Sequence, residues 1–142
     1  MTTDGSAERA AGTESTDIEV VEAVYAAMAA GDVTRLFELV DETCVITQDA
    51  RLPWGGQFLG HDGLATFGLR LREAIQSSVS THAVFAADGD VIQVGRTAGA
   101  TIATGTPFDI AEVHRWTIRD GRVVAAHFSI DTPAMLAALG RG

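Results

Sequence analysis

The chain has 142 residues, a length typical of one domain, and 46% of them are hydrophobic, which is enough for a buried core. Its net charge of -9 and pI of about 4.7 leave no basic patch to hold nucleic acid or an anionic membrane surface. The chain contains no lysine, which excludes Schiff-base chemistry, a pyridoxal phosphate linkage and a P-loop.

Motifs for metals and cofactors are also absent from the sequence. Neither C-x-x-C nor H-E-x-x-H spacing occurs, and no G-x-G-x-x-G follows a predicted strand, so we expect no metal and no cofactor. The single cysteine, Cys44, lies in an apolar run and is expected to be a small core residue. The sequence shows neither a signal-peptide pattern nor an apolar run near the roughly 20 residues of a membrane-spanning helix, which predicts a cytoplasmic protein.

The amino-terminal residues carry no apolar periodicity. Residues 1–16 are small, polar and acidic, which predicts a disordered tail. A single domain is then expected over residues 17–140. Apolar residues at helical spacing predict a helical hairpin at its start, where Gly31 ends the first helix and Asp32 caps the second.

The middle of the chain predicts a strand, a loop and a helix. A β-branched run predicts the strand over residues 43–48. Pro and paired glycines then predict a loop that reaches Asp62, which is expected to cap a third helix over residues 63–79.

Strands fill most of the second half of the chain. Alternating hydrophobicity predicts two hairpins, which turn at Asp88-Gly89 and at Asp120-Gly121, and Asp131 is expected to open a last helical turn. Helices early and strands late favour an α+β fold over βαβ alternation. We expect a cone-shaped, curved and mostly antiparallel sheet, a four-stranded meander wrapped on three helices, with an internal pocket.

The stretch EVHRW, residues 112–116, mixes polar and apolar side chains on both faces of a predicted strand. Alternation puts Glu112, His114 and Trp116 on one face, and mixed polarity on one face is what a binding pocket needs. Because an imidazole titrates near pH 6.5, His114 is predicted to be catalytic, with Glu112 orienting it and Trp116 as pocket wall. The alternatives are a core histidine that only bonds a neighbour and a Glu112 at the solvent rim.

Three stretches together resemble a known superfamily: VYAAMAAGDVTRLFELV, LPWGGQFLGHDGLATF and HRWTIRDGRVVAAHFSIDTPAML. They are similar to the nuclear transport factor 2-like superfamily, above all to its SnoaL-like branch of small-molecule enzymes, from about residue 17 to residue 140. The resemblance implies a cone-shaped fold, often dimeric, with a deep apolar pocket. For function it implies a range, because this superfamily hosts isomerases, cyclases, dehydratases, epoxide hydrolases and binders.

The resemblance also suggests site residues. His114 matches the histidine of the SnoaL-like cyclases, six residues before the Asp of the Asp-Gly turn, whereas Phe128 stands where those cyclases have a catalytic aspartate. Relative to ketosteroid isomerase, Gln48 falls at the position of the base, with Asp49 next to it. Tyr25 stands next to the position of that family's helical tyrosine.

Limonene epoxide hydrolase gives a further comparison. Its catalytic positions hold Val45, Thr47 and Phe128 in this chain, so epoxide hydrolysis is disfavoured. Asp49 is predicted as the second acid/base group if it turns inward, and Gln48 as the ligand contact if it alone does. Together, the predicted ligand contacts are Tyr25, Gln48, Arg51, Trp54, Glu112, Trp116 and Phe128.

These residues predict a cofactor-independent enzyme that moves a proton in an apolar pocket, with His114 as acid/base and Asp49 or Glu112 as its partner. The expected chemistry is cyclisation, isomerisation or dehydration of a small, mostly apolar organic molecule. The alternatives are a non-catalytic binding protein, which Phe128 supports, and a homodimerising accessory domain. We expect a homodimer, and neither nucleic acid nor membrane as partner.

Overall fold

The structure, a computed structural model, describes residues 5–141. Its helices are α1 (Gly5–Ala30), α2 (Val33–Leu39), α3 (Gly60–Ala74) and α4 (Thr132–Ala138). Its strands are β1 (Val40–Gln48), β2 (Gly56–Leu59), β3 (Ile75–Ala87), β4 (Asp90–Thr101), β5 (Pro107–Arg119) and β6 (Arg122–Ile130).

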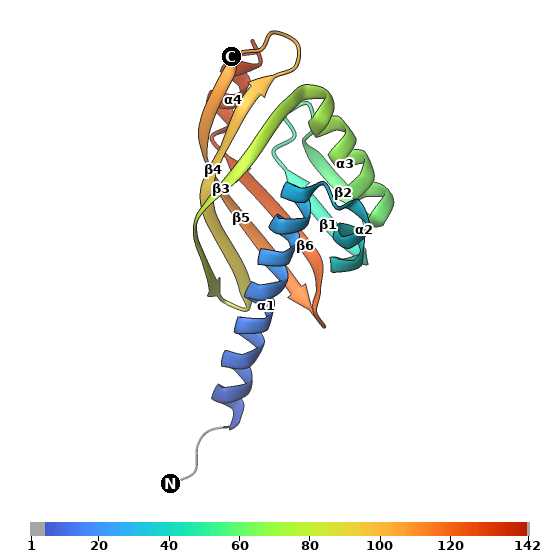
Figure 1. The fold of residues 1–142 in the computed structure, drawn as a ribbon, viewed down its shortest axis with the longest axis vertical. Coiled ribbons are helices and arrows are strands. Elements are labelled where there is room, and N and C mark those ends of the chain that lie inside the picture. Colours follow the sequence, from blue (N-terminus) through green and yellow to red (C-terminus); the bar gives the residue numbers. More distant parts are fainter. Residues whose placement is uncertain (1–4, 142) are drawn as a thin grey trace.

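The strands form one curved sheet in the order β2-β1-β6-β5-β4-β3, antiparallel except where β1 and β6 run parallel. The helix α1 crosses the sheet on one side, and α3 covers the end formed by β1 and β2 (Figure 1). The α+β class and the curved, mostly antiparallel sheet are confirmed. The expected meander of four strands is present as β3 to β6, but β1 and β2 extend it to six.

The strand β2 lies inside the segment predicted to be a loop. It pairs antiparallel with β1, from Val45 opposite Leu59 to Gln48 opposite Gly56. Four residues between glycines are too few to show the alternation that identifies a strand in a sequence. Pairing with β1, rather than local preference, decides this element.

Both predicted hairpin turns are confirmed, and their backbone explains them. Asp88 and Gly89 have φ angles of 52° and 82°, and Asp120 and Gly121 have φ angles of 52° and 76°. Two consecutive positive φ values belong to a type I′ turn, whose twist matches that of the flanking strands. Aspartate and glycine tolerate this left-handed backbone better than other residues.

The helix caps are confirmed at two of three positions. Asp32 accepts a hydrogen bond from the backbone N–H of Arg35, and Asp131 accepts one from Ala134. The third cap prediction was wrong, because α3 begins at Gly60 and leaves Asp62 within its first turn.

The predicted end of α3 was also wrong. The helix ends at Ala74, and residues 75–79 belong to β3 instead, where Ile75 pairs with Thr101 and Val79 with Thr97 of β4. The β-branched side chains of this segment fit a strand, and the long hairpin with β4 satisfies its backbone.

The helix α1 begins at Gly5, so a helix stands over residues 5–16, where the sequence predicted a disordered tail. Residues 1–4 of that predicted tail lie outside the described residues. Half of residues 5–16 are Ala, Glu or Arg, which favour helix, and the segment extends a helix that is already nucleated by packing. Figure 1 shows these first turns projecting beyond the sheet. Within residues 5–141, no helix combines the length and apolar character needed to cross a membrane.

Two glycine substitutions test the extent of α1. Gly12→Ala is expected to increase helicity, because alanine favours a helix by up to about 1 kcal/mol over glycine and nothing lies within 4 Å of the added Cβ. Circular dichroism at 222 nm measures the change. Gly31→Ala should instead lower the free energy of unfolding by about 1 kcal/mol, because Gly31 ends the helix at a φ of 67°. Unchanged helicity in Gly12→Ala would favour a disordered tail.

Candidate functional site

The strand β5 buries one complete face. Its burial alternates without interruption, and the inward side chains are Phe108, Ile110, Glu112, His114, Trp116 and Ile118. On the opposite face Asp109, Val113 and Arg115 are exposed. The prediction that Glu112, His114 and Trp116 share an inner face is therefore confirmed, and Glu112 does not lie at a solvent rim, since it is only 2% exposed.

A hydrogen-bonded chain links α1 to this face. The indole N–H of Trp116 donates to the hydroxyl of Tyr25 at 3.0 Å, and that hydroxyl lies 2.6 Å from Nδ1 of His114. An indole only donates, so Tyr25 keeps its own proton to give to Nδ1. His114 therefore accepts at Nδ1 and carries its proton on Nε2.

That Nε2 faces a carboxylate. It lies 3.2 Å from Oε2 of Glu112, within ion-pair distance, although the geometry does not make a hydrogen bond. Burial raises the pKa of Glu112 to about 7 and lowers the pKa of His114 to about 3. Both shifts have the same cause, because burial disfavours the charged form of either group. At neutral pH the imidazole is neutral and the carboxyl stands near its titration point.

Gln93 of β4 belongs to this site and was missed in the sequence. It is fully buried, stands opposite His114 in the β4–β5 register, and donates from Nε2 to the hydroxyl of Thr81 at 3.2 Å. Its amide opposes the rise in the pKa of Glu112, yet it forms no hydrogen bond that satisfies a Glu112 oxygen. The available signal was a glutamine at an inward position of an alternating strand, in VIQVG.

A glycine makes room for that amide. Gly95 stands opposite Glu112 in the register, and a Cβ on it would lie 2.7 Å from Nε2 of Gln93 and 2.1 Å from the backbone oxygen of Ser80. No side chain larger than hydrogen fits there without moving the strand β3 or the Gln93 amide.

Phe128 of β6 completes the wall around the imidazole. Its ring centroid lies 4.7 Å from that of His114 and 5.3 Å from that of Trp116, both edge-to-face. Tyr25 stacks on His114 at 6.0 Å from the other side. The structure thus brings together His114, Glu112, Trp116, Tyr25 and Phe128, as the sequence predicted.

Gln48 and Trp54 bind each other rather than His114. The indole N–H of Trp54 donates to Oε1 of Gln48 at 2.9 Å, and both side chains are buried. Gln48 stands opposite Phe128 in the parallel β1–β6 register, so the pair lies beside the wall. This bond anchors the loop after β1 to the core.

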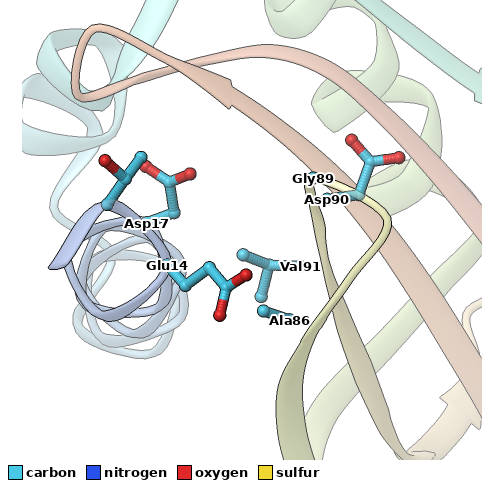
Figure 2. Close-up of a pocket in the computed structure, with 7 residues that line it drawn as sticks. Glu14, Asp17, Ala86, Gly89, Asp90 and Val91 are labelled. Carbon is cyan, nitrogen blue, oxygen red and sulfur yellow. The ribbon is translucent and has the colours of Figure 1, made fainter. Parts of the chain in front are cut away.

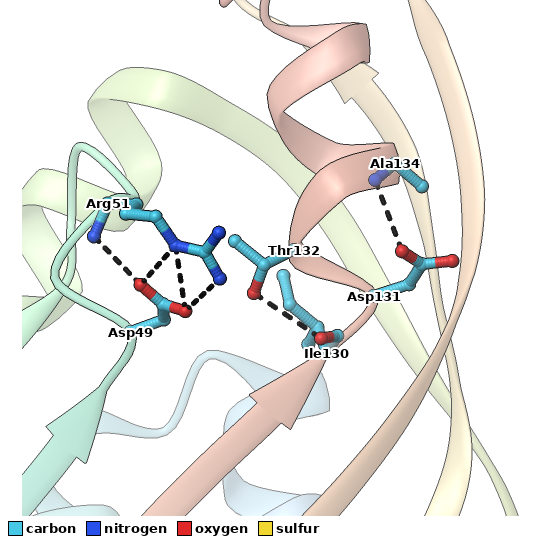
Figure 3. Close-up of polar contacts among 6 residues, drawn as sticks. All are labelled: Asp49, Arg51, Ile130, Asp131, Thr132 and Ala134. Atoms are coloured by element: carbon cyan, nitrogen blue, oxygen red, sulfur yellow. Dashed lines mark hydrogen bonds and ion pairs between the residues drawn. The ribbon is translucent and has the colours of Figure 1, made fainter. Parts of the chain in front are cut away.

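Asp49 does not turn inward, so its predicted role as the second acid/base group finds no support in the geometry. Its carboxylate takes hydrogen bonds from Arg51 through Nε, through Nη2 at 2.7 Å and through the backbone N–H (Figure 3). These contacts lower the pKa of Asp49 to about 2. The strand ends at Gln48, so the alternation that would have set the direction of Asp49 no longer applies.

The carboxylate of Asp131, at the end of the neighbouring strand β6, is also occupied. It caps α4 through the N–H of Ala134 (Figure 3). The carboxylates of Asp49 and Asp131 are thus held by local contacts, and Glu112 is the carboxylate that the structure brings to His114.

His114 lines neither of two hollows on the surface of the described residues. The first, of about 240 Å³, lies between α1 and the β3–β4 turn and carries the carboxylates of Glu14, Asp17 and Asp90 (Figure 2). The second, of about 320 Å³, lies between α3 and the carboxyl-terminal residues and includes Arg70. Over residues 5–141 no three His, Cys, Asp or Glu side chains gather as metal ligands.

Comparison with known proteins identifies the family. The SnoaL-like domain profile matches residues 21–126, most of the described chain. This chain belongs to the SnoaL-like family. No curated protein sequence matches it.

Solved structures share the fold of this SnoaL-like protein. A nuclear transport factor 2-like protein of Burkholderia xenovorans is 25% identical, over 89% of this chain and 97% of that one, with a TM-score of 0.81. TerC, co-crystallised with polyporic acid, is 22% identical over 88% and 98% of the two chains, with a TM-score of 0.80. A Xanthomonas campestris protein named as a candidate polyketide cyclase is 18% identical over 89% and 98%, with a TM-score of 0.77.

The stability of this SnoaL-like protein should show two opposed pH dependences. The pKa of Glu112 rises from 4.5 to about 7 on folding, so this group stabilises fully below pH 4.5 and its contribution is lost as the pH rises to about 7. The pKa of His114 falls from 6.5 to about 3, so its contribution is lost as the pH falls across that window. Between pH 4.5 and 6.5 the two trends oppose each other.

Single variants separate the two trends. In Glu112→Gln the free energy of unfolding should rise from pH 4.5 to 6.5, and in His114→Gln it should fall from pH 4.5 to 7, each by about 1–3 kcal/mol. Urea denaturation at several pH values measures both. Asp109→Asn, on the exposed face of the same strand, should follow the parent protein. If the free energy of unfolding of the parent protein and of the three variants changed with pH in parallel, the pKa shifts of Glu112 and His114 would be contradicted.

Proposed function

We propose that this SnoaL-like protein is a cofactor-independent enzyme that moves a proton on a small organic molecule, with Glu112 as the base. The observation that carries the proposal is the buried contact between Glu112 and His114, 3.2 Å apart. A carboxyl with a pKa of about 7 suits general acid–base catalysis near neutral pH, since it takes and returns a proton with little driving force either way.

This proposal reverses the roles that the sequence predicted, in which His114 was the acid/base group and Glu112 oriented it. His114, with a pKa lowered to about 3, does not take a proton at neutral pH. Its Nε2–H faces Glu112 and its Nδ1 is held by Tyr25, so His114 acts as a positioning residue for the carboxylate. Tyr25 and Trp116 in turn fix the orientation of the imidazole.

The step is the removal of a proton from a carbon next to a carbonyl group. The C–H bond breaks, its electron pair stays on the substrate as an enolate, and the proton goes to Glu112. Return of that proton at another carbon completes an isomerisation. In a cyclisation the enolate carbon attacks a second carbonyl, the C=O π bond breaks, and the resulting alkoxide oxygen takes the proton back from Glu112. Both outcomes conserve atoms and need no oxidant or cofactor.

Two solved structures support a small organic ligand. TerC was crystallised with polyporic acid, and the Xanthomonas protein is named as a candidate cyclase. Both proteins are similar to this chain in fold. The chemistry proposed for this chain rests on its own Glu112 and His114.

A non-catalytic binding protein is the second candidate. It is favoured by the His114 imidazole, whose two ring nitrogens already face Tyr25 and Glu112, and by Phe128 in place of an acid. In that function the same buried face binds a ligand and moves no proton.

Deuterium exchange separates the enzyme from the binder without knowledge of the natural reaction. A panel of apolar ketones and 1,3-diketones is incubated with the protein in D₂O, and NMR follows deuterium entering next to the carbonyl. Glu112→Gln should slow protein-catalysed exchange by about 10²–10⁴-fold, because the base is gone. Tyr25→Phe should slow it less and shift its pH profile, as expected of a positioning residue.

The matched control is Asp109→Asn, which removes a carboxylate from the exposed face of the same strand. It should retain the exchange rate of the parent protein. Unchanged exchange in Glu112→Gln would overturn the proposed base, and unchanged exchange in His114→Ala would overturn the positioning role.

We further propose a homodimer formed through the outer face of the sheet. Phe85 of β3 and Val113 of β5 are 44% and 43% exposed there, and His127 of β6 also faces outward, bonded to Thr47. Analytical ultracentrifugation should show a dimer, and Val113→Asp should shift it toward monomer, because a charge would be buried unpaired. A monomeric parent protein at the same concentration would contradict the proposal, and Leu69→Asp, on exposed α3, is the control.

A further inference from the structure

Three buried oxygen atoms beside His114 lack a hydrogen-bond partner. They are Oε1 of Gln93 and both carboxylate oxygens of Glu112. Gln93 is 0% exposed and Glu112 is 2% exposed, so water does not reach them from the surface. Buried polar atoms are normally paired, and each unpaired one costs about 1–3 kcal/mol.

The donors around these oxygens are already used. The indole of Trp116 donates to Tyr25, Tyr25 gives its proton to His114, and the Gln93 amide donates one of its two N–H groups to Thr81. The Nε2–H of His114 lies 3.2 Å from Glu112 without completing a hydrogen bond. A proton on Glu112 and the second N–H of the Gln93 amide are two donors for three oxygens, each with two lone pairs, so the site has a surplus of acceptors.

No positive charge of the described chain compensates Glu112. Within residues 5–141 the arginine ion pairs are those of Arg35, Arg51, Arg96 and Arg115, and these side chains are 51% to 63% exposed. The rings of Tyr25, Trp116 and Phe128 pack instead around the His114 imidazole, which faces Glu112. Aromatic faces attract a cation, and a net charge of -9 attracts one at long range.

We propose that the site beside His114 takes an organic ligand with a protonated amine. The ammonium N–H groups bind the oxygens of Glu112 and Gln93, and the apolar part of the ligand packs on the aromatic wall. A carboxylate or phosphate ligand would bring more acceptors and a repelling charge, so the site rejects it.

This inference rests on the proposed function in one respect, namely that the ligand of the protein lies against Glu112. It is compatible with that function if one Glu112 oxygen binds the ammonium and the other takes the proton of a neighbouring C–H group, which the positive nitrogen makes more acidic. Glu112 and Gln93 are buried and line neither of these two hollows, so wall side chains must move when the ligand enters. Tyr25 and Phe128 are the half-buried members of that wall.

Three probes of equal size and different charge test the ligand class: benzylammonium, benzyl alcohol and benzoate. Isothermal titration calorimetry of the full chain at about pH 8.5, above the pKa of Glu112, gives their affinities. Benzylammonium should bind at least about tenfold more tightly than benzyl alcohol, and benzoate most weakly. Amide chemical shifts should change at Gln93 and His114.

Two variants test whether the preference for an ammonium ligand depends on the oxygens of Glu112 and Gln93. Glu112→Gln should lower the affinity for benzylammonium by about tenfold or more and leave the affinity for benzyl alcohol nearly unchanged. Gln93→Leu should lower the affinity for benzylammonium by a few fold. Asp109→Asn, which also removes one negative charge, should bind all three probes like the parent protein. If Glu112→Gln does not fold, the three probes on the parent protein and Gln93→Leu carry the test.

Equal affinity for benzylammonium and benzyl alcohol, tighter binding of benzoate, or no binding of benzylammonium would each overturn the proposal. Deuterium exchange, with aminoketones added to the panel of ketones, distinguishes this failure from failure of the enzyme. Exchange that depends on Glu112 without amine binding overturns the ligand class alone. Amine binding that depends on Glu112 without exchange overturns the enzyme alone.

Discussion

The burial of Glu112 against His114 is the constraint on which the inner face of this protein depends. A charged carboxylate with 2% exposure costs several kcal/mol unless it is paired, so the fold holds it close to neutrality. The same burial keeps the imidazole neutral. Two groups that would form a simple ion pair in water are thereby converted into a carboxyl that titrates near neutral pH and an imidazole that does not.

The helix α1 supplies the second half of this arrangement. Tyr25 meets His114 and Trp116 across about 90 residues of sequence, and it reaches them because α1 packs against β3, β4 and β5. A direct consequence is that the imidazole has one tautomer, set by an indole on the same strand. The proton order along Trp116, Tyr25 and His114 follows from the fact that an indole only donates.

Much of the fold was predictable because its signals are local. Three kinds of feature depend on a few adjacent residues and were predicted correctly. They are the two Asp-Gly turns, the caps Asp32 and Asp131, and the shared face of Glu112, His114 and Trp116. The errors lie where pairing overrides local preference. The strand β2 was taken for a loop, and α3 was extended into β3. Whether Asp49 or Gln48 turns inward stayed open in the sequence, because the strand ends at Gln48 and the bonds from Arg51 to Asp49 lie in the loop beyond it.

The sequence by itself determined that this is an acidic, lysine-free α+β protein with a polar inner strand face at EVHRW, because composition and two-residue alternation need no partner segment. Only the tertiary structure decided which carboxylate meets His114, brought Gln93 opposite it, and left three oxygens without donors. These outcomes depend on the register of β4 against β5 and on the depth of burial. Both are properties of segments distant in sequence, which alternation along a single strand does not contain.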